Sequence, residues 1–187
     1  MHGLERLDAS STLDDLVRRC LGGDRLAHQQ LYRLYCKSMY NVGFRIVNDE
    51  DDAEDVLQEA FISAFRNLKE YRGDSTFGAW LKRIVINKAI NHLKRKRLER
   101  FPEDERWDVK EEAELDEFEG YPFSVERVRD AIGRLPDGYR AVLSLYLLEG
   151  YDHGEIAEIL GITESTSKSQ FNRSKKKLLE ILEGGKS

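Results

Sequence analysis

Two stretches of the chain bring cationic side chains together with groups that can hydrogen-bond to bases. Residues 168–177 hold five Lys or Arg and no acid, and residues 81–100 hold eight Lys or Arg against one acid. Cations pair with phosphate oxygens, while Ser, Thr and Asn side chains can read the edges of bases. The two stretches therefore predict contacts with nucleic acid at two separate places.

The stretch at residues 81–100 follows a cluster of aromatic residues. Tyr71, Phe77 and Trp80 surround the turn at residues 72–75, whose sequence is RGDS. Unpaired bases stack on aromatic rings while cations hold the backbone, so this combination is typical of single-stranded nucleic acid. The alternative is that these rings belong to the core. We favour the core for Trp80 and base contact for Phe77, which we expect in the loop. The basic cluster at 94–97 can also be a solvated helix end.

The elements that must position these residues are all expected to be helical. Apolar residues recur every three or four positions, and no segment alternates as a strand does. Asp24, Ser75 and Thr163 are expected N-caps. The expected helices cover residues 13–21, 24–47, 51–68, 76–97, 124–135, 137–149, 155–160 and 163–182.

Residues 101–122 interrupt this pattern. They are acidic, contain two of the three prolines and show weak periodicity, so we interpret them as a flexible linker. The predicted fold class is therefore all-α, with two small helical domains at residues 1–100 and 123–187 joined by an acidic linker at 101–122.

The second domain has the pattern of a helix-turn-helix. A short helix is followed by Gly161, which can adopt a positive φ, and then by a longer helix. Ile156, Ala157 and Leu160 are expected to face the longer helix, and Ile162 to fill the corner. The alternative is an ordinary helical hairpin with a solvated basic face. In the DNA-binding interpretation, the longer helix presents Thr166, Lys168, Ser169, Asn172, Arg173 and Lys175 to the outside.

The third expected helix carries an acidic face. Asp55, Gln58, Glu59 and Ile62 are spaced at i, i+3, i+4 and i+7, which places them on one side of a helix. This face is a candidate surface for binding another protein; the alternative is a solvated face without a partner.

Several function classes are disfavoured by composition. The net charge of -5 argues against indiscriminate binding to polyanions. We find no nucleotide loop, metal cluster or nucleophile–base pair, so we expect no enzyme activity, no cofactor and no metal. Cys20 and Cys36 lie 16 positions apart and are interpreted as small buried hydrophobes. With no apolar run long enough to span a bilayer and no secretory signal, we expect a cytoplasmic protein.

Two long segments resemble conserved regions of bacterial sigma factors. The segment at 53–97, AEDVLQEAFISAFRNLKEYRGDSTFGAWLKRIVINKAINHLKRKR, is similar to their second region. The segment at 135–178, LPDGYRAVLSLYLLEGYDHGEIAEILGITESTSKSQFNRSKKKL, is similar to their fourth region. The acidic linker without a third domain resembles the extracytoplasmic-function (ECF, group four) subclass of the sigma-70 superfamily.

The resemblance implies roles for particular residues. Asp55, Gln58 and Glu59 match positions that dock on the clamp helices of the polymerase β′ subunit, and Ile62 completes that face. The minus-ten element of a promoter would be read and melted by Tyr71, Arg72, Asp74, Ser75, Phe77, Trp80, Lys82, Arg83, Asn87, Asn91, Lys94 and Arg95. The minus-thirty-five element would be read by Thr166, Lys168, Ser169, Asn172, Arg173 and Lys175. Ser167 departs from the family pattern, because a buried aliphatic residue is usual there.

The implied partners are core RNA polymerase, through the β′ clamp helices and the β flap, and promoter DNA. An anti-sigma factor is a further implied partner, and we expect a monomer when the protein is free. A hypothesis at this stage is that the acidic linker masks the basic faces. Two other classes remain open: a stand-alone helix-turn-helix regulator with a sensor or dimerisation domain, and an enzyme with a helical DNA-binding tail.

Overall fold

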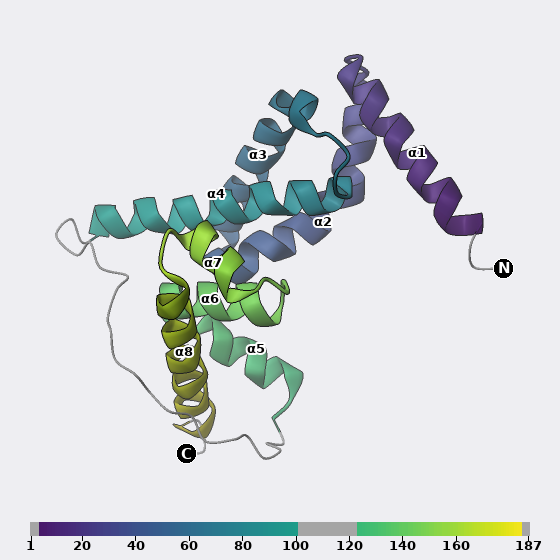
Figure 1. Ribbon diagram of the computed structural model, residues 1–187. Helices are drawn as coiled ribbons and strands as arrows, with labels where there is room; N and C mark the ends of the chain where they lie inside the picture. The colour runs from purple at the N-terminus through teal and green to yellow at the C-terminus, as the bar shows by residue number, and fades with distance from the viewer. Residues whose placement is uncertain (1–3, 101–122, 185–187) are drawn as a thin grey trace.

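The computed structural model describes the backbone of residues 4–100 and 123–184, and the side chains of residues 13–96 and 123–184 (Figure 1). Every regular element in these ranges is a helix, which confirms the all-α prediction. The segment expected to be a flexible linker, residues 101–122, lies outside the described residues. The elements are α1 (Leu4–Leu21), α2 (Arg25–Val47), α3 (Glu50–Arg66), the short 3-10 helix η1 (Leu68–Glu70), α4 (Phe77–Arg100), α5 (Val125–Gly133), α6 (Asp137–Leu147), α7 (His153–Leu160) and α8 (Glu164–Gly184).

Local capping residues set most of the helix boundaries. The Asp24 carboxylate accepts hydrogen bonds from the backbone N–H groups of Leu26 and Ala27, which fixes the start of α2 as predicted. The start of α4 differs from the prediction. Thr76, not Ser75, is its cap, because the Thr76 hydroxyl accepts from the Ala79 N–H at 3.2 Å.

The first four helices pack together, with α2 and α4 at the centre. Leu31, Ile46, Leu81 and Ile86 are completely buried between them. The helices α2 and α3 lie close together at Gly43, whose Cα position would place a Cβ 3.4 Å from Cγ1 of Val56, in van der Waals contact. This packing fixes α4 along its length and so determines which of its side chains reach the surface.

In the last four helices, α8 packs against α5, α6 and α7. The helix-turn-helix is formed by α7 and α8, and Gly161 between them has φ 71°, the left-handed conformation predicted for the turn. Ile156 and Leu160 are buried against α8 as expected, and Ala157 is 9% exposed.

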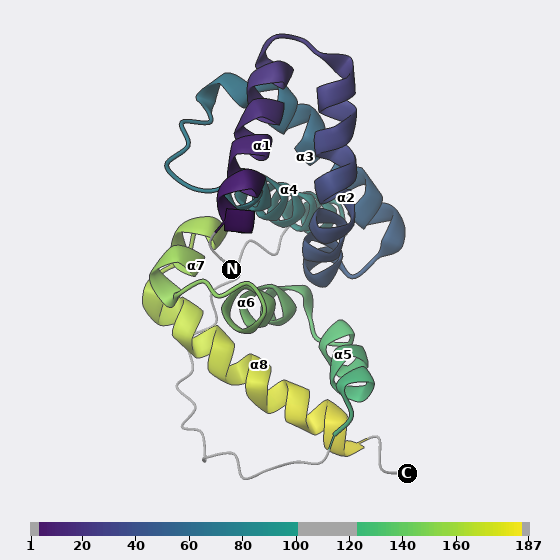
Figure 2. The same ribbon diagram turned by 90° about the vertical axis from the view of Figure 1, so that its right-hand side faces the viewer.

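The two groups of helices share one apolar core. Ala141, Val142 and Leu145 of α6 belong to the same buried cluster as the residues of α2 and α4. Figures 1 and 2 show α6 and α7 lying directly below α2 and α4, so the two halves are stacked. Such direct packing goes beyond the prediction of two domains held together by a tether.

Two expectations from composition can also be compared with the fold. Cys20 is buried, whereas Cys36 is half-buried, so only the first fits the predicted role of a buried hydrophobe. Among the helices in the described part of the chain, none has the length and apolar character needed to cross a membrane.

Candidate nucleic-acid interface

The loop before α4 borders an open cavity of about 740 Å³. The phenolic O–H of Tyr71 donates a hydrogen bond to the backbone carbonyl of Ser75 at 2.8 Å, which closes the loop on itself. Gly73 at its tip has φ 78°, a conformation that glycine adopts without strain. The cavity therefore offers aromatic and cationic side chains to a flat ligand, with two carboxylates, Glu70 and Asp74, also in its lining. Its lining consists of Lys69, Glu70, Tyr71, Arg72, Asp74, Ser75 and Trp80.

Of the two aromatic candidates, Phe77 differs from the prediction, whereas Trp80 packs partly against the core as expected and also reaches the cavity. Phe77 does not lie in the loop: it is the first residue of α4, is only 1% exposed, and packs against Tyr35, Tyr71 and Trp80. The expectation that Phe77 lies open to a base is therefore wrong for this structure, because the ring completes the core beneath the loop. Trp80, expected in the core, is half-buried and lines the cavity.

The outer face of α4 carries the predicted polar residues. Asn87 and Asn91 are exposed and lie one helical turn apart, so they form one hydrogen-bonding strip. The cations beside this strip are already paired. Lys82 reaches Glu149, Lys94 reaches the carbonyl of Leu160, Arg83 reaches Glu158, and Arg95 reaches Glu59.

The predicted protein-binding face of α3 is accessible. Asp55 and Gln58 are exposed, and the apolar side chain of Ile62 is 58% exposed. Glu59 is half-buried because it pairs with Lys88 and Arg95 of α4. The structure thus brings the four predicted residues together on one face, with Glu59 at its edge.

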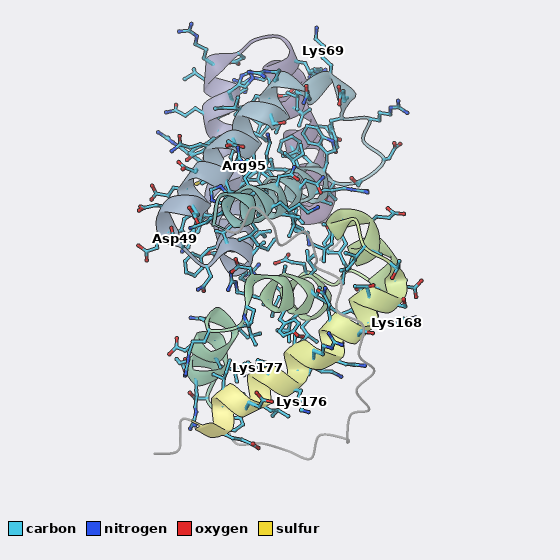
Figure 3. The ribbon with its side chains drawn as sticks, turned by 90° about the vertical axis from the view of Figure 1, so that its left-hand side faces the viewer. Asp49, Lys69, Arg95, Lys168, Lys176 and Lys177 are labelled. Atoms are coloured by element: carbon cyan, nitrogen blue, oxygen red, sulfur yellow. The ribbon has the colours of Figure 1, made fainter. Side chains whose placement is uncertain are left out.

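The second helix of the helix-turn-helix presents most of the predicted residues. Lys168 is exposed and pairs with Glu164 at 2.6 Å, and Ser169, Asn172, Arg173 and Lys175 are half-buried. Figure 3 shows Lys168 near one end of α8 and Lys176 and Lys177 further along the helix.

Thr166 is a correction to this set. It was expected to point outward, but it is only 9% exposed and its hydroxyl lies 2.8 Å from the hydroxyl of Thr163. The Thr166 side chain is therefore part of the cap at the start of α8.

Sequence reasoning missed a residue that holds this helix in place. Nδ1 of His153 lies 2.9 Å from the hydroxyl of Ser167, and the imidazole stacks on Tyr146 and meets Phe171 edge-on. Ser167 is fully buried. Burial lowers the pKa of His153 below its ordinary value of 6.5, and the nearby Lys168 lowers it further. The one sequence signal was Ser167 itself, a polar residue at a position expected to be aliphatic.

Comparison with protein families gives two matches in chain order. Residues 31–99 match the model of sigma-70 region 2, and residues 125–178 match the model of sigma-70 region 4.

Within the described part of the chain, no three His, Cys, Asp or Glu side chains gather closely enough to hold a metal ion.

Individual relatives match over nearly the whole chain. The chain is 31% identical to the ECF RNA polymerase sigma factor SigM of Mycobacterium tuberculosis, over 95% of this chain and 86% of the relative. It is 36% identical to the RNA polymerase sigma-H factor of Pseudomonas aeruginosa, over 90% of this chain and 92% of the relative.

Two solved structures share the fold. The sigma factor RpoE of Bartonella quintana, solved in complex with the anti-sigma factor NepR, matches with a TM-score of 0.55 and 20% identity over 83% of this chain and 96% of that one. CnrH, solved in complex with the cytosolic domain of CnrY, matches with a TM-score of 0.53 and 24% identity over 90% of this chain and 96% of that one.

Proposed function

The chain belongs to the extracytoplasmic-function family of RNA polymerase sigma factors, and we propose that it directs core polymerase to promoters by reading two DNA elements with its two groups of helices. In this proposal the protein acts in the cytoplasm and catalyses no reaction itself; RNA synthesis belongs to the polymerase.

The observation that carries the proposal is the ring-lined cavity at the start of the basic helix α4. A base extruded from the duplex needs a surface on which to stack, and Tyr71 and Trp80 supply one beside the Arg72 cation. The exposed amides of Asn87 and Asn91 lie further along the same helix and suit the unpaired strand. Capture of the unpaired bases offsets the cost of unstacking, which is about a few kcal/mol per step.

The minus-thirty-five element is assigned to α8. The second helix of a helix-turn-helix enters the major groove, where polar and cationic side chains can reach base edges and phosphates. Lys168, Ser169, Asn172 and Arg173 are proposed to read bases, and Lys175 to contact phosphate. We assign these roles to a domain at residues 123–187, and the minus-ten element to a domain at residues 1–100.

Core polymerase is proposed to bind the exposed face of α3. Asp55, Gln58 and Ile62 offer two polar groups around an apolar centre, which suits a protein partner. When both domains are held on polymerase, weak contacts at two promoter elements add through effective concentration. An anti-sigma factor, such as NepR in the solved complex with RpoE of Bartonella quintana, would compete for the same faces.

The test is a pull-down with core polymerase followed by run-off transcription. A sigma factor confers promoter-dependent initiation on bare core enzyme. A stand-alone regulator instead changes transcription by a polymerase that already carries another sigma factor. Failure of the purified protein to co-elute with core polymerase would rule out the proposal.

A further inference from the structure

A polar residue is buried where the two helices of the helix-turn-helix meet. Ser167 of α8 is fully buried, and it stands immediately before Lys168 and Ser169, which are proposed to read bases. A buried hydroxyl without a hydrogen-bond partner costs stability. The hydroxyl of Ser167 finds its partner on α7, where Nδ1 of His153 lies 2.9 Å away.

A second buried serine on α8 satisfies its hydroxyl in a different way. Ser174 is also fully buried, and its hydroxyl donates to the carbonyl of Phe171 at 2.7 Å. This hydrogen bond stays within the helix, as is common for serine. The bond of Ser167 to His153 instead joins two helices, so it is a tertiary contact that fixes α8 relative to α7.

The imidazole of His153 is itself held by neighbouring rings. It stacks on Tyr146 of α6, with ring centroids 4.6 Å apart and planes at 19°, and it meets Phe171 of α8 edge-on at 5.6 Å. The start of α7 is fixed by the capping box at Asp152. The three helices α6, α7 and α8 pack on one another (Figure 2), and this ring contacts residues of both neighbours. The ring therefore offers Nδ1 to α8 from a constrained position.

The surroundings of the ring favour its neutral form. Burial lowers the pKa of His153 below its ordinary value of 6.5, and the cation of Lys168 lowers it further. The carboxylates of Glu164 and Asp152 oppose this shift without reversing it. A neutral imidazole has one N–H and one acceptor nitrogen, and a hydroxyl can donate or accept. The bond to Ser167 therefore needs no buried charge.

A hydrogen bond restricts the two helices more than an aliphatic contact does. It weakens steeply when its distance or angle changes, whereas the burial of apolar surface has no preferred direction. Rotation or sliding of α8 against α7 would break the bond between His153 and Ser167, but would change an aliphatic contact only slightly. The same movement would displace Lys168, Ser169 and Asn172, because they belong to the same helix.

We propose that the hydrogen bond between His153 and Ser167 sets the orientation of α8 in the major groove and thereby determines which bases of the minus-thirty-five element the chain prefers. Both are positioning residues. Ser167 is fully buried and acts only through the helix that it anchors. The proposal rests on the proposed function, because it takes α8 as the helix that reads these bases.

The first test measures base preference rather than affinity. Holoenzyme is bound to DNA duplexes randomised across the minus-thirty-five element, and sequencing gives the enrichment of each base. Ser167→Ala should weaken the preference at the most strongly selected positions by about three- to tenfold, which is part of the discrimination that one base pair supplies. A preference is a ratio of two affinities of one protein, so it does not depend on the fraction of molecules that can bind.

Ser174→Ala is the matched control for this test. It removes the same hydroxyl from an equally buried site on α8, but the lost hydrogen bond lies within the helix. It should keep the base preference of the wild type. Preferences at the minus-ten element, measured with a second library, should be unchanged in both variants because α4 is not altered. Wild-type preference in Ser167→Ala, or an equal loss in Ser174→Ala, overturns the proposal.

The second test separates positioning from stability. His153→Phe combined with Ser167→Val replaces both partners by apolar groups of similar size, which can leave stability nearly unchanged because no polar group is left unpaired. A pair with a merely structural role would be replaced fully by this substitution. We expect thermal unfolding close to that of the wild type, but a base preference changed at least as much as in Ser167→Ala. Wild-type preference in the double variant overturns the proposal.

A conservative variant gives the converse test. The amide nitrogen of asparagine lies as many bonds from the backbone as Nδ1 of histidine, and that of glutamine as many as Nε2. His153→Asn should therefore retain much of the base preference, whereas His153→Gln should lose it as Ser167→Ala does. Equal losses in these two variants overturn the proposal. A wild-type holoenzyme without any preference in the minus-thirty-five library would instead refute the proposed function.

Discussion

At the residue scale, burial distinguishes the side chains that stabilise the fold from those that are accessible to a ligand. Phe77 and Trp80 are neighbours on one helix turn with ring centroids 5.6 Å apart, yet Phe77 is buried and Trp80 lines the cavity. Sequence favoured base contact for Phe77, because this residue was expected in the loop and only Trp80 on the apolar stripe of the helix. The decision depends on Tyr35, which is more than forty positions away on α2 and covers Phe77.

Substitution of Phe77 should therefore mainly affect stability, and substitution of Trp80 should mainly affect binding. Phe77→Ala should lower the free energy of unfolding by about 3–5 kcal/mol, since it empties a core site. Trp80→Ala should cost less stability but weaken binding of the holoenzyme to a pre-melted promoter by about 1–3 kcal/mol, the loss of one stacked base. Urea unfolding and a fluorescence binding assay measure the two quantities. Weaker binding caused by Phe77→Ala at full stability would contradict the assignment.

His153 gives a pH dependence with a defined sign. Because burial lowers the pKa of His153 in the folded protein, the unfolded chain binds a proton first as the pH falls. The contribution of this residue to stability is therefore complete above pH 6.5 and is lost as the pH drops through and below that value. His153→Gln should be less stable at neutral pH but lose less on acidification. Urea unfolding of both proteins across that range measures the difference, and parallel losses would contradict it.

At the element scale, sequence predicted most helix boundaries because the signals are local. The Asp24 cap at the start of α2 and Gly161 at the end of α7 each act within four residues of the boundary that they set. Three predictions at this scale were wrong. Thr76 replaces the adjacent Ser75 as the cap of α4, and Thr166 turns toward Thr163 rather than outward. The first helix begins at Leu4, well before the expected residue 13.

The α3 face makes a prediction of its own at this scale. Gln58→Ala and Ile62→Ala should each weaken binding of core polymerase, because both side chains are exposed and available to a partner. Circular dichroism should stay unchanged, since neither side chain supports the core. Gln30→Ala, which removes the same amide from an exposed site on α2, is the control and should bind as the wild type does. Native-gel titration with core enzyme measures the affinities; equal binding by all three variants would exclude this face as the docking site.

At the scale of the whole molecule, sequence predicted two helical units but not how they pack. The contacts that decide the arrangement are single long-range pairs: Arg45 and Glu149 lie 104 positions apart, and Arg140 reaches the carbonyl of Ile46 across 94. No periodicity or local motif encodes such a pair. The net charge of -5 likewise hides it, because the acid at Glu149 is placed against the cations of α2 and α4 rather than in solvent.

If these contacts hold the two helical units together, the covalent connection between the units is dispensable for their packing. A protease site inserted within residues 101–122 and then cut should leave two fragments that still co-elute on gel filtration, because Val142 and Leu145 share a core with α2 and α4. Arg140→Ala should separate the cut fragments, since it leaves the carbonyls at the end of α2 without donors. Arg134→Ala, at an exposed position between α5 and α6, is the control. Cut fragments of the wild type that elute separately would show that a tether, and not the shared core, keeps the two halves together.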